Sequence, residues 1–143
     1  MPITQAMATS FKVQLLNGQQ NFSSNTFKLA LYTSSATINE NTTAYSATNE
    51  VPSTGNYSAG GNTLTVSVTP TNSGNVAYIS FANTSWANAT ITAAGALIYN
   101  TSQSNAAVCV LSFGGDKTST NGTFAVNFPT ADASNAIIRL TAS

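Results

Sequence analysis

The residues that could carry proton-transfer chemistry are few, because the chain has no histidine and only four carboxylates: Glu40, Glu50, Asp116 and Asp132. An enzyme that moves protons or holds a metal needs such groups close together. We interpret the segments around all four acids as loops, and no spacing forces two of them into the pair that a glycosidase uses. We therefore expect no catalytic residue, no cofactor site and no enzymatic activity.

Metal, phosphate and thiol chemistry have little support either. A calcium loop needs closely spaced oxygen ligands, and no Asp-x-Asp-x-Asp-Gly run occurs, which leaves only a site assembled from distant loops as an alternative. Residues 114–117, Gly-Gly-Asp-Lys, lack the longer glycine frame of a phosphate-binding loop and favour a hairpin tip. Cys109 is the sole cysteine and lies in the apolar run 106–111, so we expect a buried, unreactive strand thiol.

Aromatic side chains are the remaining groups that could bind a ligand. Five of them could together form a sugar-stacking platform: Trp86, Tyr45, Tyr57, Tyr78 and Tyr99. Aromatic residues on strands more often fill a core, and that is the preferred interpretation. Tyr45 and Tyr57 are the exceptions, because they lie in a long polar segment, residues 33–62, that we expect to contact something. This segment is the candidate for contact with a host-surface glycan.

The composition of the chain restricts its partners. Charged residues make up 6% of the sequence, against about 25% in average proteins, whereas apolar residues make up 42%. A net charge of zero gives no electrostatic attraction to nucleic acid or to an anionic membrane surface. Soluble monomers usually keep their net charge away from zero. We therefore expect much of the surface to meet protein, in a homo-oligomer or a larger assembly, with a neutral monomer as the alternative.

Three basic residues lie within or beside apolar segments: Lys12, Lys28 and Arg139. Their aliphatic stems can lie on a core while the charge reaches an edge or an acid. We expect a structural ion pair, with Glu50 as one candidate partner. No run of the sequence approaches the roughly 20 apolar residues of a membrane-spanning helix.

The N-terminal segment repeats an apolar residue every four positions: Ile3, Met7, Phe11 and Leu15. This period is typical of one helix face, and it predicts a helix at about residues 4 to 17. Pro2 suits the start of such a helix and Gly18 suits the residue past its end. A strand, from the alternation of apolar and polar residues between Phe11 and Leu15, is the alternative. The first residues lack the basic start and apolar run of a secretory signal, so we expect synthesis in the cytosol.

Most of the remaining sequence has a period of two, which is typical of strands. The clearest alternation runs from Leu64 to Val68, where we expect Val66 inside and Thr65 outside. The same criteria predict further strands at residues 27–32, 76–81, 86–91, 94–99, 108–113, 124–128 and 136–140. Residues 27–32 should have one core face, and residues 114–122 should form a hairpin loop because they are rich in glycine, Asp and Asn.

About eight strands, with turn signals at intervals of about eight to twelve residues, predict an all-β protein. The expected architecture is an antiparallel β-sandwich or jelly roll with one short N-terminal helix. The chain length suits a single domain, 1–143, with a helical segment at 1–18 and the sandwich at 26–143. The apolar stripe that begins at Ile3 would cover an open end of the sandwich or reach a neighbouring subunit, and it is our first candidate for a contact surface.

Short blocks stand out along most of the chain: Phe11-Lys12, Gly18, Asn21-Phe22, residues 26–32, Glu50-Val51, residues 57–61, Leu64, Trp86, residues 95–99, residues 113–117 and Phe128-Pro129. Together they resemble small virion-associated structural proteins of tailed bacteriophages. In that pattern a tyrosine directly follows a glycine, whereas here Asn56 separates Gly55 from Tyr57. The resemblance implies a place in the virion, after synthesis in the host cytoplasm, with other virion proteins as partners.

Within a virion, the small size and charge-poor surface favour a head decoration or cement protein bound to the capsid shell. One alternative is a tail component, either a fibre or receptor-binding module or a tube or adaptor subunit. A free carbohydrate-binding β-sandwich is a third hypothesis, from a different class. We expect neither nucleic acid nor membrane as a partner, and we expect contacts made by apolar burial and neutral hydrogen bonds.

Overall fold

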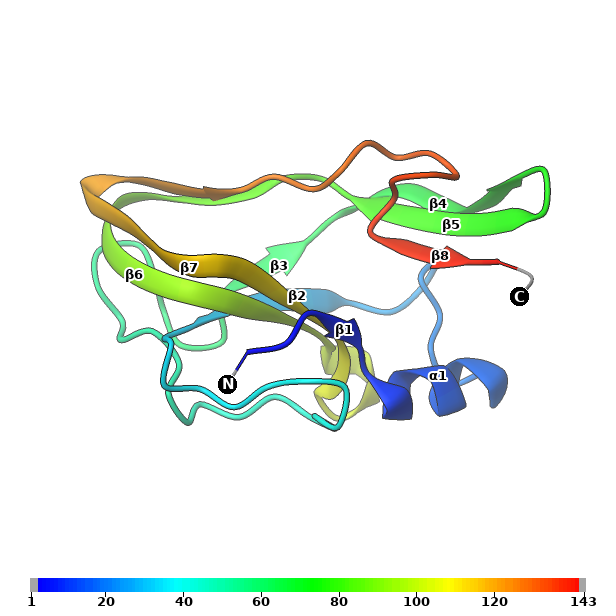
Figure 1. Cartoon of the computed structure of the whole chain (residues 1–143), viewed down its shortest axis with the longest axis horizontal. Coiled ribbons are helices and arrows are strands. Elements are labelled where there is room, and N and C mark those ends of the chain that lie inside the picture. Colours follow the sequence, from blue (N-terminus) through cyan, green and yellow to red (C-terminus); the bar gives the residue numbers. More distant parts are fainter. Residues whose placement is uncertain (1–2, 142–143) are drawn as a thin grey trace.

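The computed structural model describes residues 3–141, which form two antiparallel sheets and one short helix (Figure 1). The larger sheet has the order β1-β7-β6-β2-β3 and the smaller one β4-β5-β8. The elements are β1 Ala6–Met7, α1 Thr9–Leu16, β2 Phe27–Tyr32, β3 Asn62–Leu64, β4 Val66–Ser73, β5 Val76–Phe81, β6 Thr84–Asn100, the 3₁₀ turn η1 Thr101–Gln103, β7 Ala106–Val126 and β8 Ile138–Leu140. The predicted all-β, sandwich-like fold with one short helix is confirmed.

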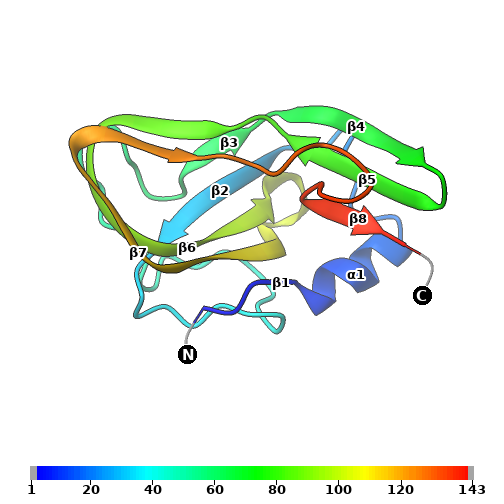
Figure 2. The same cartoon turned by 45° about the horizontal axis from the view of Figure 1, so that its top comes forward.

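Strands β6 and β7 form one long ribbon that turns over at the end of the molecule opposite to α1 (Figures 1 and 2). Ala93 pairs with Lys117 and Gly95 pairs with Ser112, so residues 113–116 of β7 lie opposite Ala94 alone. This large bulge bends the ribbon, and the positive φ angles of Gly114 and Gly115, 79° and 148°, suit the bend. The ribbon therefore contributes strands to both sides of the core.

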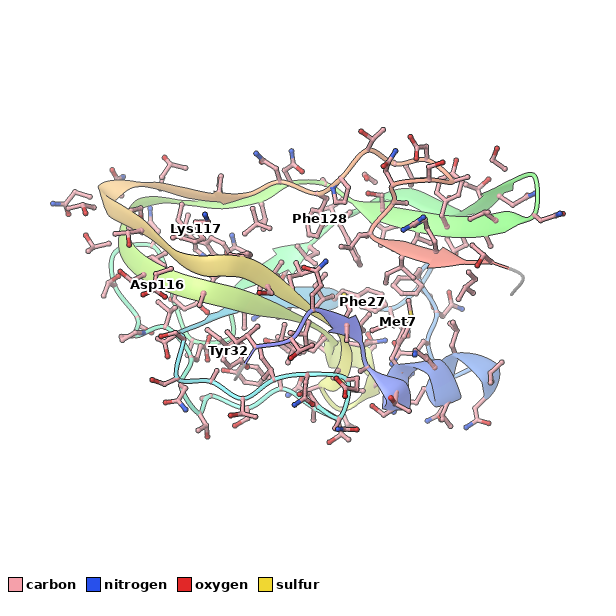
Figure 3. The ribbon with its side chains drawn as sticks, viewed as in Figure 1. Met7, Phe27, Tyr32, Asp116, Lys117 and Phe128 are labelled. Carbon is pink, nitrogen blue, oxygen red and sulfur yellow. The ribbon has the colours of Figure 1, made fainter. Side chains whose placement is uncertain are left out.

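The ribbon corrects two sequence-based predictions. Residues 86–91 and 94–99 belong to the single strand β6, and residues 108–113 and 124–128 belong largely to the single strand β7. Residues 114–122 are not a hairpin loop, because they lie within β7 and Lys117, Thr118, Ser119 and Gly122 pair with β6. The glycine-rich composition predicted a chain reversal, but the glycines instead permit the backbone angles of a bulge inside a continuous strand. Figure 3 shows Asp116 and Lys117 at this corner.

The N-terminal segment is only partly helical. Helix α1 begins at Thr9, whereas residues 6–7 form strand β1 against Cys109 and Val110, and Ile3 forms a parallel bridge with Ile38. Phe11 is fully buried, and Ile3, Met7 and Leu15 pack against the same core. The stripe is therefore used inside the protein, and the expectation that it reaches a neighbouring subunit is wrong. Its four-residue period spans a strand and a helix that share one core.

Strand β2 is buried on both faces, contrary to the prediction of one core face. Phe27, Leu29 and Leu31 are buried, but so are Ala30 and Tyr32. The second face is covered by the long excursion between β2 and β3, residues 33–61, which is held by isolated bridges such as that from Glu50 to Tyr32. A segment without regular strands thus acts as part of the packing around the sheet.

The alternation across β3 and β4 is as predicted. Leu64 is buried, Val66 and Val68 are half-buried, and Thr65 is exposed. The strand is divided at Thr65, because β3 pairs with β2 in the large sheet and β4 pairs with β5 in the small one. This crossing connects the two sheets along one side of the sandwich.

Candidate functional site

The most concentrated group of polar chemistry surrounds Glu50, whose side chain is buried in the excursion. The Tyr45 hydroxyl donates to Glu50 Oε1 at 2.5 Å, and the Tyr57 hydroxyl donates to Oε2 at 2.6 Å. The backbone N–H of Gly60 also donates to Oε2, at 2.7 Å. A buried carboxylate is therefore compensated by three neutral donors, which agrees with the rule that buried charges must be hydrogen-bonded.

Two further tyrosines complete what we call the Glu50–tyrosine cluster: Tyr32, Tyr45, Tyr57 and Tyr99 around Glu50. The Tyr99 hydroxyl donates to Gly60 O at 2.6 Å, and its ring stacks on that of Tyr45 with centroids 4.7 Å apart. The Tyr32 hydroxyl donates to Ser46 O at 2.6 Å. The cluster thereby joins the excursion to β2 and β6.

The pKa of all four cluster tyrosines is raised. Burial is the larger cause, and interaction with the Glu50 carboxylate is the second. The pKa of Tyr99 rises to about 12, and the pKa values of Tyr32, Tyr45 and Tyr57 rise further above the ordinary value. The phenols therefore stay protonated at neutral pH and act as hydrogen-bond donors. The arrangement anchors the excursion, and Gly61 permits the close approach, because a Cβ there would lie 1.7 Å from Leu29 O.

The aromatic residues that could have stacked on sugar do not form a platform on the surface. Trp86, Tyr57 and Tyr99 are at most 2% exposed, and Tyr45 is half-buried against Tyr99. The preferred interpretation, that aromatic residues fill the core, is confirmed for Trp86, which packs 5.4 Å from the Tyr57 ring. From the sequence alone, Tyr45 and Tyr57 remained candidates for surface contact. Their burial could not be predicted, because the residues that cover them lie far away in the chain.

The other carboxylates lie apart from this cluster. Glu40 and Asp116 are exposed, and Asp132 accepts hydrogen bonds from Ser134 N–H and from both the backbone and the side chain of Asn135. Hydrogen bonds from Asn135 and Ser134 lower the pKa of Asp132 below its usual range. Asp132 is therefore a local turn cap. Within residues 3–141 no three His, Cys, Asp or Glu side chains gather at a distance suited to a metal ion.

The basic residues do not make the expected contact with Glu50. The hydrogen bonds of its carboxylate come from the neutral donors described above, and Lys12 and Arg139 are exposed. Lys28 is half-buried on β2, with its Nζ beside Gly60. The prediction of an ion pair with Glu50 is therefore wrong: phenol and amide groups satisfy the carboxylate instead.

Cys109 lies in β7 and is 5% exposed. Burial raises the pKa of its thiol to about 12, which keeps the sulfur protonated and poorly nucleophilic at neutral pH. The predicted buried strand thiol is confirmed.

Helix α1 and strand β8 lie at the same end of the molecule, which we call the α1–β8 end (Figures 1 and 2). The exposed large apolar side chains of the described chain all lie on these two elements: Val13 is 54% exposed, Leu16 90% and Leu140 47%. Leu140 also lines a pocket of about 200 Å³, together with Leu15 of α1 and with Phe22, Ile79 and Ile138.

The register of the small sheet explains this pocket. Ile79 pairs with Ile138 and Ala77 with Leu140, so alternate residues of both strands share one sheet face. The two isoleucines are buried, but Ala77 and Leu140, farther along the same face, are exposed. An apolar sheet face therefore extends beyond its cover. This surface was not predicted from the sequence. Its only signal there is Leu16, an apolar residue that does not fit the four-residue period.

None of the helices within residues 3–141 has the length and apolar character needed to span a membrane. Comparison with known proteins finds no matching protein-family model, no matching curated protein and no matching solved structure.

Proposed function

We propose that this chain is a structural protein of a tailed-bacteriophage virion, and specifically a head decoration or cement protein that binds the capsid shell. The observation that carries the proposal is the α1–β8 end, where Leu140 lies exposed at an apolar pocket and Val13 and Leu16 lie exposed on α1. An apolar pocket with exposed apolar side chains on the elements around it is the kind of surface that contacts another protein. The sequence blocks that resemble virion-associated proteins suggest which assembly supplies that partner.

The rest of the molecule is consistent with a binding subunit that has no catalytic role. Its chemically most capable group, the Glu50–tyrosine cluster, is engaged in holding the excursion to the sheet. With only 6% charged residues, attachment would rest on apolar burial and neutral hydrogen bonds, which salt screens little. The proposed partners are other virion proteins and further copies of the chain, with neither nucleic acid nor membrane among them.

The first experiment measures where the protein is found. Quantitative peptide counting on purified particles of the phage that carries the gene gives its copy number. A copy number close to that of the major shell protein supports head decoration. A few copies per particle would replace this assignment with a tail component, such as a receptor-binding fibre module or an adaptor subunit. Absence from the particles would contradict the virion assignment and favour a free carbohydrate-binding module.

The second experiment tests the surface. The double variant Leu16→Asn/Leu140→Asn should be lost from particles that retain the wild type, because it removes the exposed apolar contacts. Ala87→Asn is the matched control, since it places the same polar side chain on an exposed position of β6. A wash with about 1 M salt should leave the wild type bound, whereas urea should release it. Retention of the double variant, or release by salt alone, would contradict the proposed contact.

A further inference from the structure

The chain contains two Asn-Gly pairs, Asn17-Gly18 and Asn121-Gly122, and the structure holds them differently. In such a pair the backbone nitrogen of the glycine can attack the side-chain carboxamide carbon of the asparagine, because glycine has no Cβ to obstruct the approach. Both asparagines are exposed, so access of water does not distinguish the two pairs. What distinguishes them is how firmly the backbone and the side chain are held in place.

The first pair is fixed by hydrogen bonds at the end of α1. Gln19 N–H donates to Gln14 O at 2.8 Å. Gly18 N–H donates to Leu15 O at 3.2 Å, and these two bonds together form a Schellman motif. The Asn17 carboxamide also donates to Gln19 Oε1, at 3.4 Å. Before the two groups could react, the Gly18 nitrogen would therefore have to give up its hydrogen bond and the asparagine side chain would have to leave its neighbour.

The second pair lies in an irregular part of β7, beside the corner of the ribbon (Figure 1). Gly122 pairs with Ala89, but the register of β7 against β6 shifts on both sides of this pair, so local opening there costs little. Asn121 has a φ of 48°, and its N–H donates to Thr90 Oγ1 at 3.0 Å. Its side chain makes no hydrogen bond within residues 3–141. The Asn121 carboxamide is therefore free to turn towards the Gly122 nitrogen.

We propose that Asn121 is a site of spontaneous modification, at which the folded protein converts its own asparagine to aspartate and isoaspartate. The Gly122 nitrogen loses its proton to solvent and bonds to the side-chain carbon of Asn121, and the amide group leaves as ammonia. One water molecule then opens the succinimide ring that has formed. Opening at one carbonyl gives aspartate, and opening at the other gives isoaspartate, in which the main chain runs through the side-chain carbon.

The reaction changes both the charge and the backbone of this region. The chain has four acids and four bases, so one further carboxylate makes its net charge negative. Isoaspartate also adds a methylene group to the main chain, next to the pair formed by Gly122 and Ala89. The corner of the ribbon lies at the end of the molecule opposite to α1, so the change affects a different surface from the α1–β8 end (Figures 1 and 2). The inference is therefore independent of the proposed attachment to a capsid.

Peptide mapping of the purified, folded protein after incubation in mildly alkaline buffer tests the proposal. Trypsin cuts after lysine and arginine, so Asn17 falls in peptide 13–28 and Asn121 in peptide 118–139. Mass spectrometry with fragmentation then follows both reactions in one sample. Asn121 should be modified about tenfold faster than Asn17, which corresponds to about 1.4 kcal/mol in the barrier. In urea, where neither pair is held, the two rates should become similar.

Equal rates in the folded protein, or no modification of Asn121, would overturn the proposal. A difference that persists unchanged in urea would also overturn it, because the fold would then not be its cause.

Gly122→Ala is the matched control, because it obstructs the attack without disturbing the fold. A Cβ at Gly122 would meet only Thr120 O, at 3.5 Å, which is an ordinary contact, and the φ of Gly122 is not in the left-handed region. The variant should keep the circular dichroism spectrum and melting temperature of the wild type. Modification of Asn121 should slow about tenfold, which corresponds to a barrier about 1.4 kcal/mol higher. An unchanged rate would contradict attack by the Gly122 nitrogen.

The products give a second test that needs no variant. Opening of the succinimide ring yields isoaspartate as well as aspartate, whereas direct hydrolysis of the side chain yields aspartate alone. Peptide 118–139 of the incubated wild type should therefore appear in both product forms, which chromatography separates and an isoaspartyl methyltransferase distinguishes. Aspartate without isoaspartate at position 121 would overturn the proposal.

Discussion

Removing the hydroxyl of Tyr57 should destabilise the protein much more than removing that of Tyr45. The Tyr57 hydroxyl donates to Glu50 Oε2 at 2.6 Å and accepts from Leu31 N–H at 2.9 Å, in a side chain that is 1% exposed. The variant Tyr57→Phe therefore deprives a buried carboxylate of a donor and a buried amide of its acceptor. Tyr45 is half-buried and donates only to Glu50, where water can replace it.

The two losses have different expected sizes. A hydrogen bond to a charged group contributes about 1.5–3 kcal/mol, and a buried amide left without an acceptor costs about 1–3 kcal/mol. Tyr57→Phe should therefore lower the free energy of unfolding by about 3–5 kcal/mol. Tyr45→Phe should lower it by about 1 kcal/mol, because solvent reaches the site. Domains of this kind have a total stability of about 5–15 kcal/mol, so the first variant should lose a large part of it.

Urea unfolding measured by circular dichroism gives both values, and the fluorescence of Trp86, the only tryptophan, supplies a second probe. Tyr78→Phe is the matched control, because Tyr78 lies on β5 outside the cluster, and it should change stability by less than about 0.5 kcal/mol. If Tyr57→Phe cost less than about 1 kcal/mol, or no more than Tyr45→Phe, the view that this hydroxyl holds the excursion to β2 would be refuted.

Further predictions concern pH, the thiol, the strand pattern and the buried acid. Burial raises the pKa of each cluster tyrosine above the unfolded value of about 10, so stability should be complete below about pH 10 and fall as the pH rises. In an alkaline titration most tyrosinate absorbance should therefore appear together with unfolding, and early ionisation of the folded protein would contradict this. Because the pKa of the Cys109 thiol is raised to about 12, a disulfide reagent should react with it only after denaturation. Val66→Asp should cost about 2–3 kcal/mol in a melting experiment and Thr65→Asp less than about 0.5, since the first is half-buried and the second exposed; the reverse order would mean that the faces are misassigned. Glu50→Gln should lower the melting temperature more than Glu40→Gln, because an amide cannot accept all three hydrogen bonds, and equal effects would argue against the cluster as an anchor.

The fold class follows from the sequence because strand periodicity is a local property. Strand β5 begins and ends where the alternation does, at Val76 and Phe81, and the helix ends before Gly18 as expected. The corner of the ribbon could not be predicted in this way. Residues 114–117 have the composition of a chain reversal, and only the partner strand shows that the chain bends without reversing.

The candidate site depends still more on distant contacts. Glu40 and Glu50 lie in similar polar surroundings in the sequence, yet one is exposed and the other is buried among tyrosines. Those tyrosines come from β2, β6 and two points of the excursion, so no local spacing connects them. Composition could predict only that contacts with a partner would be made by uncharged side chains. Which side chains are exposed at the α1–β8 end depends on how much of the small sheet is covered by Phe22 and Leu15.

The ribbon also determines the order in which the chain can fold. Its two strands are joined by a short turn at residues 101–105, so the hairpin can close within about 1–10 μs. The larger sheet cannot assemble before it, because β1 and β2 pair with its strands. Strand β1, in contrast, pairs with Val110 only when a loop of roughly a hundred residues closes. The conformational entropy of that loop must be lost before the pairing can stabilise the fold. We expect substitutions in the ribbon to slow folding and substitutions in β1 mainly to speed unfolding.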